Sequence, residues 1–240
     1  MAKKVGKKSS YKGTSTLEVL EGAYRYNTWI SESILPFVEP PVLEIGAGIG
    51  NLSALFVNKT PITLTDLESE FVKVLQNKFD DKEKVNVRKF DISKSPDSTI
   101  INKYNTVISV NVLEHIEDDL KALINLKKTL KKNGKIIMLV PAKKKAFSRL
   151  DKELGHFRRY EKEELSQLLS SAGFKVEKIH FFNIVGLLTW VTRNYLTSQN
   201  VQLTARQVAM FDLIVPILKP IEKRVKVPIG ISLIAVATNE

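Results

Sequence analysis

The sequence contains no cysteine among its 240 residues and only 3 histidines. A chain without cysteine forms no disulfide framework, no thiolate metal site and no cysteine nucleophile. Because the histidines are scattered singly, the sequence also predicts no metal site built from protein ligands. Long apolar runs are missing too: the start of the chain is basic without an apolar run behind it, and no later run reaches the ~20 residues that span a bilayer. These absences predict a cytoplasmic protein.

The remaining composition is that of an ordinary globular chain, 43% hydrophobic and 26% charged. We expect a flexible basic tail over residues 1–15 and a single domain over 16–240. The net charge is +11, and lysines and arginines without acids gather in the tail and in residues 121–149. Such runs are typical of a solvated face. They also attract anionic partners, namely nucleic acid, a phospholipid surface or a phosphorylated substrate, and charge alone leaves this choice open.

Apolar segments with strand and helix patterns alternate along the chain. After a predicted N-terminal helix over 16–35, strands are expected at 42–45, 62–65, 85–88, 106–110, 135–140, 175–182 and 231–237. Helices are expected at 52–57, 70–79, 118–131 and 162–172, with Asn133 and Gly134 closing the third of these. This alternation predicts an α/β fold with a mostly parallel sheet covered by helices on both faces.

A glycine-rich turn follows the first predicted strand. Gly46, Ala47, Gly48 and Gly50 leave room for a ligand to approach the backbone. Glu44 lies two residues before the first glycine, where its carboxylate would repel the pyrophosphate of a dinucleotide. The same carboxylate would suit a cationic ligand. S-adenosylmethionine carries a sulfonium and an ammonium group and no phosphate, so it matches this loop.

Acidic and amide side chains follow the next predicted strands. Asp66 ends the second strand, beside Leu67, and can accept hydrogen bonds from both hydroxyls of a ribose. By itself Asp66 could equally be a helix N-cap. Asp91 after the third strand can accept from an adenine amino group while Ile92 packs on the ring, and Asn111 follows the fourth strand. The sequence therefore predicts an adenosine site along one sheet edge.

In this order and spacing, residues 40 to 140 resemble the class I S-adenosylmethionine-dependent methyltransferases. The resemblance implies a Rossmann-like sheet of seven strands with the last strand antiparallel. It also implies that Glu44 and the glycine turn hold the methionine moiety, Asp66 the ribose, and Asp91 with Ile92 the adenine. Asn111 would border the sulfonium. The implied cofactor is S-adenosylmethionine, the product is S-adenosylhomocysteine, and no metal is required.

A second dense segment, residues 155–160, reads Gly-His-Phe-Arg-Arg-Tyr and follows the fifth predicted strand. It resembles a G-H-x-R-R-Y segment of methyltransferases that act on small molecules, lipids or glycans. His156 could be a general base for a hydroxyl. Arg158 and Arg159 could hold a carboxylate or phosphate, with Tyr160 beside them at the substrate. The alternative is that the arginines line a helix start and Tyr160 packs beneath it. His115 and His180 are expected to be structural.

Residues 183–230 form an insertion before the last strand, with apolar runs at 184–191 and 208–218. We expect a small helical cap that supplies an apolar wall to the acceptor pocket. There are three alternatives: the insertion could extend the core, form a dimer interface, or dock shallowly on the anionic inner membrane surface. The oligomeric state does not follow from the sequence.

Three functions compete on these residues. Methyl transfer to a small-molecule, lipid-linked or glycan acceptor is favoured. An RNA methyltransferase would suit the positive charge, but the sequence lacks a recognisable RNA-binding appendage, so nucleic acid is the disfavoured partner. A non-catalytic adenosyl-binding partner subunit is the third alternative, although neither the glycines nor the acids of the site are lost.

Overall fold

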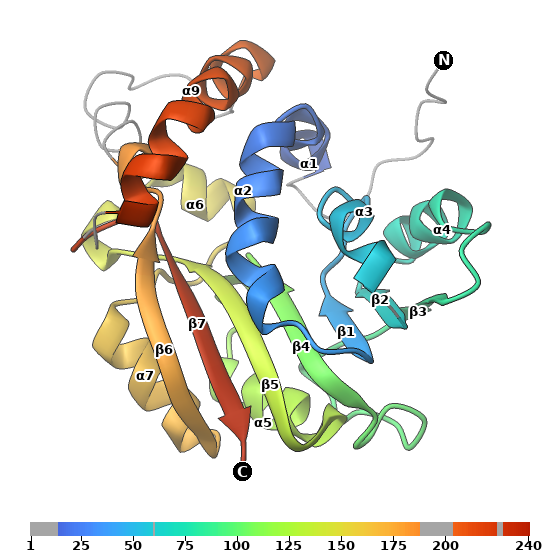
Figure 1. Ribbon diagram of the computed structural model, residues 1–240. Helices are drawn as coiled ribbons and strands as arrows, with labels where there is room; N and C mark the ends of the chain where they lie inside the picture. The colour runs from blue at the N-terminus through green and yellow to red at the C-terminus, as the bar shows by residue number, and fades with distance from the viewer. Residues whose placement is uncertain (1–13, 60, 188–203, 225–227) are drawn as a thin grey trace.

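The computed structural model describes residues 14–59, 61–187, 204–224 and 228–240, and its centre is a seven-stranded sheet (Figure 1). The strands lie in the order β3-β2-β1-β4-β5-β7-β6. The first five strands pair in parallel and β7 runs antiparallel between β5 and β6, as the sequence predicted. The strands are β1 Val42–Ile45, β2 Ile62–Asp66, β3 Val85–Lys89, β4 Tyr104–Val110, β5 Leu130–Pro141, β6 Phe174–Phe182 and β7 Ser232–Asn239.

Helices cover both faces of the sheet. The helices of the described residues are α1 Thr14–Glu21, α2 Tyr24–Ile34, α3 Ser53–Phe56, α4 Ser69–Lys78, α5 Asp119–Thr129, α6 Arg149–Leu154, α7 Lys162–Ser171 and α9 Ala205–Arg224. One buried cluster joins the sheet to α5 and α7, and the other joins it to α2, α3, α4 and α9. The central strands β1 and β2 are buried along their whole length, as expected for parallel strands covered on both faces.

The largest departure from the predicted elements is at the start of β5. The helix expected to reach residue 131 ends at Thr129, whose hydroxyl donates to the carbonyl of Leu126 at 2.7 Å and competes with the helical pattern. Leu130 is buried and already pairs with Tyr104 of β4. The register then shifts before Lys135, so the predicted helix stop at 133–134 is instead an irregularity inside a strand.

The ends of the domain also differ in detail from the prediction. The single N-terminal helix expected over 16–35 is two helices, α1 and α2, separated at Gly22 and Ala23. The second apolar run of the insertion forms α9, which packs against α2 (Figure 1). Residues 188–191 of the first run lie outside the described residues. Within the described part of the chain, no helix combines the length and apolarity needed to cross a membrane.

Candidate functional site

The glycine turn forms the floor of a cavity at the carboxyl ends of the parallel strands. Gly46 has a φ of +67°, a conformation that side-chain-bearing residues rarely adopt. A Cβ atom at this position would come within 2.4 Å of Cγ2 of Val112, which follows β4. The loops after β1 and β4 therefore approach each other closely, and only glycine fits between them.

Glu44, Gly46, Ala47 and Gly48 all line this cavity, but Gly50 does not. A Cβ at Gly50 would meet the side chains of α4 and the residue after it, Leu75 at 3.1 Å and Phe79 at 3.0 Å. Contact between Gly50 and the cofactor stays a prediction. Because Gly50 has no side chain, the loop after β1 can pack closely on α4.

Asp66 at the end of β2 fixes the glycine turn. One of its carboxylate oxygens accepts from the backbone N–H of Gly48 at 2.9 Å, and the other accepts from the N–H of Glu68 at 2.9 Å. Burial raises the pKa of this carboxyl above its usual value, against these two hydrogen bonds. Asp66 lines the cavity, and each carboxylate oxygen can accept a further hydrogen bond, as binding of two vicinal hydroxyls requires.

Glu44 lies deeper, 4% exposed in the middle of the buried strand β1. Burial, with a smaller effect of the Asp66 charge, raises the pKa of its carboxyl from 4.5 to about 7. Its Oε2 atom is buried and has no hydrogen-bond partner. A buried acceptor that lacks a donor is costly, and a cationic donor in the cavity would satisfy it.

The far side of the cavity is formed by the segments that follow β2, β3 and β4. Leu67, Asp91, Ile92 and Asn111 all line it. Leu67 is 49% exposed, whereas Ile92 is buried and offers a flat apolar contact. Asn111 adopts a positive φ of 52° and donates its N–H to the carbonyl of Leu139 on β5. The residues predicted for ribose, adenine and sulfonium therefore meet in one place.

The cavity continues past these residues toward the segment after β5, and its volume is about 930 Å³. Its second half is lined by His115, His156 and Arg159, and by apolar side chains of α9. From the N-terminal helices, Leu17, Leu20, Tyr26, Asn27 and Ile30 also contribute. Sequence reasoning did not assign these helical residues to the site because nothing local distinguishes them from core residues.

His156 is held in a defined orientation by Asp151 of α6. The left-handed Gly155, with a φ of +81°, ends α6 and turns the chain back on it. As a result, Nδ1 of His156 lies 2.9 Å from Oδ1 of Asp151, and Nε of Arg159 donates to the same oxygen at 2.9 Å. Burial alone would raise the pKa of Asp151, but these hydrogen bonds hold it below its usual value. An ionised Asp151 places the proton of a neutral His156 on Nδ1 and leaves Nε2 as the basic atom.

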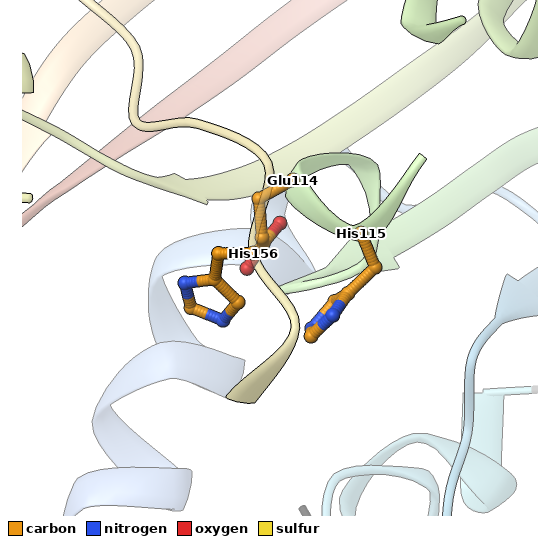
Figure 2. A group of neighbouring side chains, drawn as sticks. All are labelled: Glu114, His115 and His156. Carbon is orange, nitrogen blue, oxygen red and sulfur yellow. The ribbon is translucent and has the colours of Figure 1, made fainter. Parts of the chain in front are cut away.

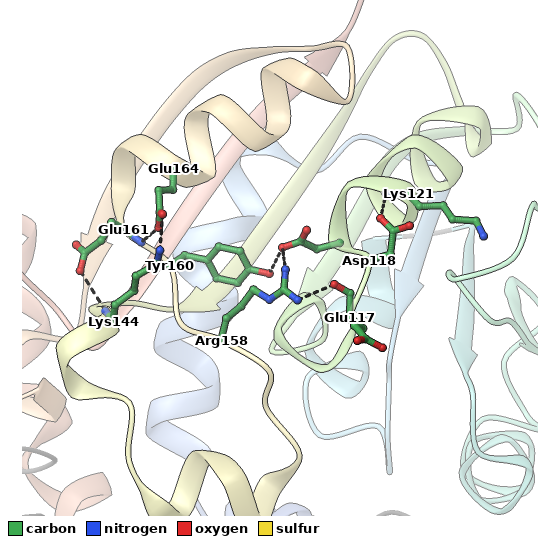
Figure 3. Close-up of polar contacts among 9 residues, drawn as sticks. Glu117, Asp118, Lys121, Lys144, Arg158, Tyr160, Glu161 and Glu164 are labelled. Carbon is green, nitrogen blue, oxygen red and sulfur yellow. Dashed lines mark hydrogen bonds and ion pairs between the residues drawn. The ribbon is translucent and has the colours of Figure 1, made fainter.

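Neither Arg158 nor Tyr160 lines the cavity, and Figure 3 shows both side chains directed at the same carboxylate group. Arg158 donates to Asp119 at 2.9 Å and to the carbonyl of Glu117, and the hydroxyl of Tyr160 donates to Asp119 at 3.0 Å. Tyr160 is 3% exposed, and burial together with the Asp119 charge raises its pKa. In the structure these two side chains tie the segment to the start of α5, and their contact with substrate stays a prediction.

Arg159 has a different position. Its guanidinium is 3% exposed, lines the cavity and donates to the carbonyl of Ala142 at 3.2 Å as well as to Asp151. These two hydrogen bonds hold the guanidinium in place, and one of them fixes the orientation of Asp151. Asp151 itself was not singled out by the sequence, although the Ser148–Asp151 capping box marks the start of α6.

Glu114, His115 and His156 bring one carboxylate and two imidazoles together (Figure 2). A ligand atom from each lies within 4.8 Å of the others. Burial raises the pKa of Glu114 to about 8, and burial with the nearby His156 lowers that of His115 to about 4. His115 was expected to be structural, yet it lines the cavity. The prediction that the chain uses no metal stays a prediction.

Comparison with known proteins agrees with this site. A family model for a methyltransferase domain matches residues 22–179. A non-reducing polyketide synthase, ausA of Aspergillus calidoustus, is 27% identical over 109 residues, and polyketide synthase PksR of Bacillus subtilis is 26% identical over 152 residues. These stretches are 42% and 52% of this chain but 4% and 6% of those synthases, so the chain spans a small fraction of the relatives it matches.

Among solved structures, the complex of the Haloferax volcanii Trm112 methyltransferase activator with a methyltransferase matches with a TM-score of 0.66. The identity is 13%, and the match covers 98% of this chain and 99% of that one, which shows a shared fold. The glycine turn, the acids after β2 and β3 and the family match over 22–179 all agree. The chain belongs to the methyltransferase domain family.

Proposed function

We propose that this methyltransferase methylates a small acceptor with an apolar portion, and that His156 is the general base. The observation that carries the proposal is the continuity of the cavity. The residues suited to the cofactor line the same cavity as His156 and apolar side chains of α9. A methyl donor and an acceptor bound in one continuous cavity can be aligned for in-line transfer.

The residues of the first half fit S-adenosylmethionine. The unpartnered Oε2 of Glu44 would accept from the ammonium group, and the two oxygens of Asp66 would accept from the ribose hydroxyls. Ile92, buried beside Asp91, would pack on the adenine ring. When bound, the cofactor supplies an activated methyl group, so the protein needs mainly to orient the nucleophile.

On the acceptor side, Nε2 of His156 would take the proton of a hydroxyl or amine as its oxygen or nitrogen attacks. Asp151 keeps Nδ1 protonated and stabilises the imidazolium that forms, since its carboxylate is ionised and fully buried. Arg159 neutralises part of the Asp151 charge and holds it in place. This arrangement favours acceptors whose nucleophile must lose a proton.

The shape of the cavity favours an acceptor with an apolar part over a polar glycan or an RNA. Val208, Phe211 and Ile214 from α9 contribute apolar wall to the cavity that His156 also lines. Two relatives are named polyketide synthases, which is compatible with a small-molecule acceptor. The proposal covers the class of acceptor and not its individual identity.

The test is a methyl-transfer assay with radiolabelled S-adenosylmethionine and a panel of phenols, hydroxy fatty acids and isoprenoid alcohols, with an RNA arm. We expect label in a hydroxylated apolar acceptor, lost in His156→Gln and reduced in Asp151→Asn. Cofactor affinity, measured by calorimetry, should be retained in both variants. Transfer to RNA alone, or undiminished turnover in His156→Gln, would overturn the proposal.

A further inference from the structure

Helix α9 has an uncovered apolar face. Met210, Leu213, Ile214, Ile217 and Ile221 are 63%, 66%, 37%, 65% and 53% exposed. Their spacing of three or four residues places them in one stripe along the helix. We call these five residues the α9 stripe.

The opposite face of α9 is the buried one. Val208 and Val215 are 7% and 2% exposed, and Phe211 and Leu218 pack against the cluster that includes α2. The helix is therefore apolar on both sides, and among the described residues only the side facing α2 is covered. A contiguous apolar surface of this kind marks an interaction site more often than an ordinary solvent-facing helix.

The α9 stripe borders the mouth of the cavity. Met210 and Ile214 belong to the stripe and also line the cavity. Leu17 and Leu20 of α1, a helix that contacts α9, line the cavity as well. Figure 1 shows α9 standing beside α2 and rising above the sheet, at the end where the cavity lies. Whatever covers the stripe is thus placed next to the acceptor entrance.

Charge indicates which partner fits. The two acids of α9 are turned to the interior: Asp212 accepts from the N–H of Tyr26 at 2.8 Å, and Glu222 accepts from the N–H of Asn183 at 2.9 Å. Exposed Arg206 and Arg224 mark the two ends of the helix. The outer face of α9 therefore presents apolar and basic side chains.

A third basic group lies beside the stripe. Arg25 of α2 is exposed, and its Nη1 donates to the carbonyl of Leu213 at 3.3 Å. The whole chain carries a net charge of +11, which adds long-range attraction to a negative surface. An apolar stripe flanked by arginines is the pattern of a helix that lies in the plane of an anionic bilayer.

We propose that the α9 stripe docks on an anionic phospholipid surface, so that the cavity opens toward the bilayer and admits an acceptor dissolved in it. Docking does not require catalysis. Only the entry of an acceptor from the bilayer into the cavity rests on the proposed function. The acceptor class narrows to amphiphiles whose apolar part resides in the membrane.

The test is flotation of the full chain with vesicles of phosphatidylcholine, with and without about one quarter phosphatidylglycerol, at low and at high salt. We expect the chain to float with the anionic vesicles at low salt. Leu213→Ser/Ile217→Ser, which changes two stripe residues that do not line the cavity, should lower the partition coefficient by at least about tenfold. Arg206→Glu/Arg224→Glu should weaken binding to anionic vesicles only.

A matched control changes two exposed isoleucines away from α9, Ile101 and Ile124, 42% and 39% exposed. Ile101→Ser/Ile124→Ser should float like the unchanged chain. Calorimetry with S-adenosylmethionine separates the two proposals, because Leu213→Ser/Ile217→Ser should bind the cofactor normally while losing the vesicles. No flotation with anionic vesicles, or equal loss in the control, would overturn docking. A dimer in light scattering that Leu213→Ser/Ile217→Ser dissociates would assign the stripe to a second copy instead.

Discussion

Glu44 offers the sharpest test of the cofactor site, through the substitution Glu44→Gln. Burial raises the pKa of its carboxyl from 4.5 to about 7, so the folded chain without ligand holds a proton that the unfolded chain releases. The free energy of unfolding should fall as pH rises from about 4.5 to about 7. Over that window the loss amounts to about 3 kcal/mol, taking about 1.4 kcal/mol for each pH unit.

A cation bound beside Glu44 reverses this effect, because it favours the ionised carboxylate. Binding of S-adenosylmethionine near pH 7 should therefore release about half a proton, because a carboxyl with a pKa of about 7 is half protonated there, and calorimetry in two buffers with different ionisation enthalpies measures this release. Glu44→Gln should abolish this release. It should also weaken binding by about 1.5–3 kcal/mol, the usual contribution of a hydrogen bond to a charged group, and remove the part of the stability loss between pH 4.5 and 7 that comes from Glu44.

Glu114 is the matched control, since burial raises the pKa of its carboxyl to about 8 and it does not line the cavity. Glu114→Gln should change the pH dependence of unfolding but leave the proton release on cofactor binding intact. Equal affinity and equal proton release in Glu44→Gln and the unchanged chain would refute the assignment of Glu44 to the ammonium group.

Four further outcomes are expected. Asp66→Ala should weaken S-adenosylmethionine binding in calorimetry by about 1–3 kcal/mol, because two acceptor oxygens for the ribose are lost; unchanged affinity would contradict this role. Gly46→Val should lower the melting temperature as well as abolish cofactor binding, since it strains a positive φ and meets a neighbouring side chain. Tyr160→Phe should cost about 1 kcal/mol in urea unfolding and leave turnover nearly intact, whereas a large loss of turnover at unchanged stability would restore a substrate role. Treatment with EDTA should leave methyl transfer unchanged, and restoration of a lost activity by Zn²⁺ would instead indicate that the carboxylate and imidazoles near His156 bind a metal.

The fold and the cofactor half of the site could be predicted because they depend on local signals. A buried parallel strand reads as an apolar run, and a turn that requires positive φ reads as glycine. Glu44, Asp66 and Asp91 each lie at or just after such a strand, so parallel pairing brings them to one edge of the sheet. The glycine pattern was ambiguous at Gly50, because close packing against α4 also requires glycine at this position.

The acceptor half depended on contacts between distant segments. Arg158 and Tyr160 have the side chains of a substrate clamp, but Asp119, about forty residues earlier in the chain, engages both. The residue type determines which hydrogen bonds a side chain is able to make. Only tertiary packing decides which partner comes within about 3 Å of it.

The sequence by itself determined the order of strands and helices, the glycine turn and the chemistry of the cofactor contacts, because periodicity and backbone conformation are properties of neighbouring residues. The tertiary structure alone decided that Asp151 orients His156, that His115 faces the cavity and that α9 buries one apolar face while exposing the other. Burial is a property of what surrounds a residue, and two apolar faces of one helix look alike until the fold covers one of them.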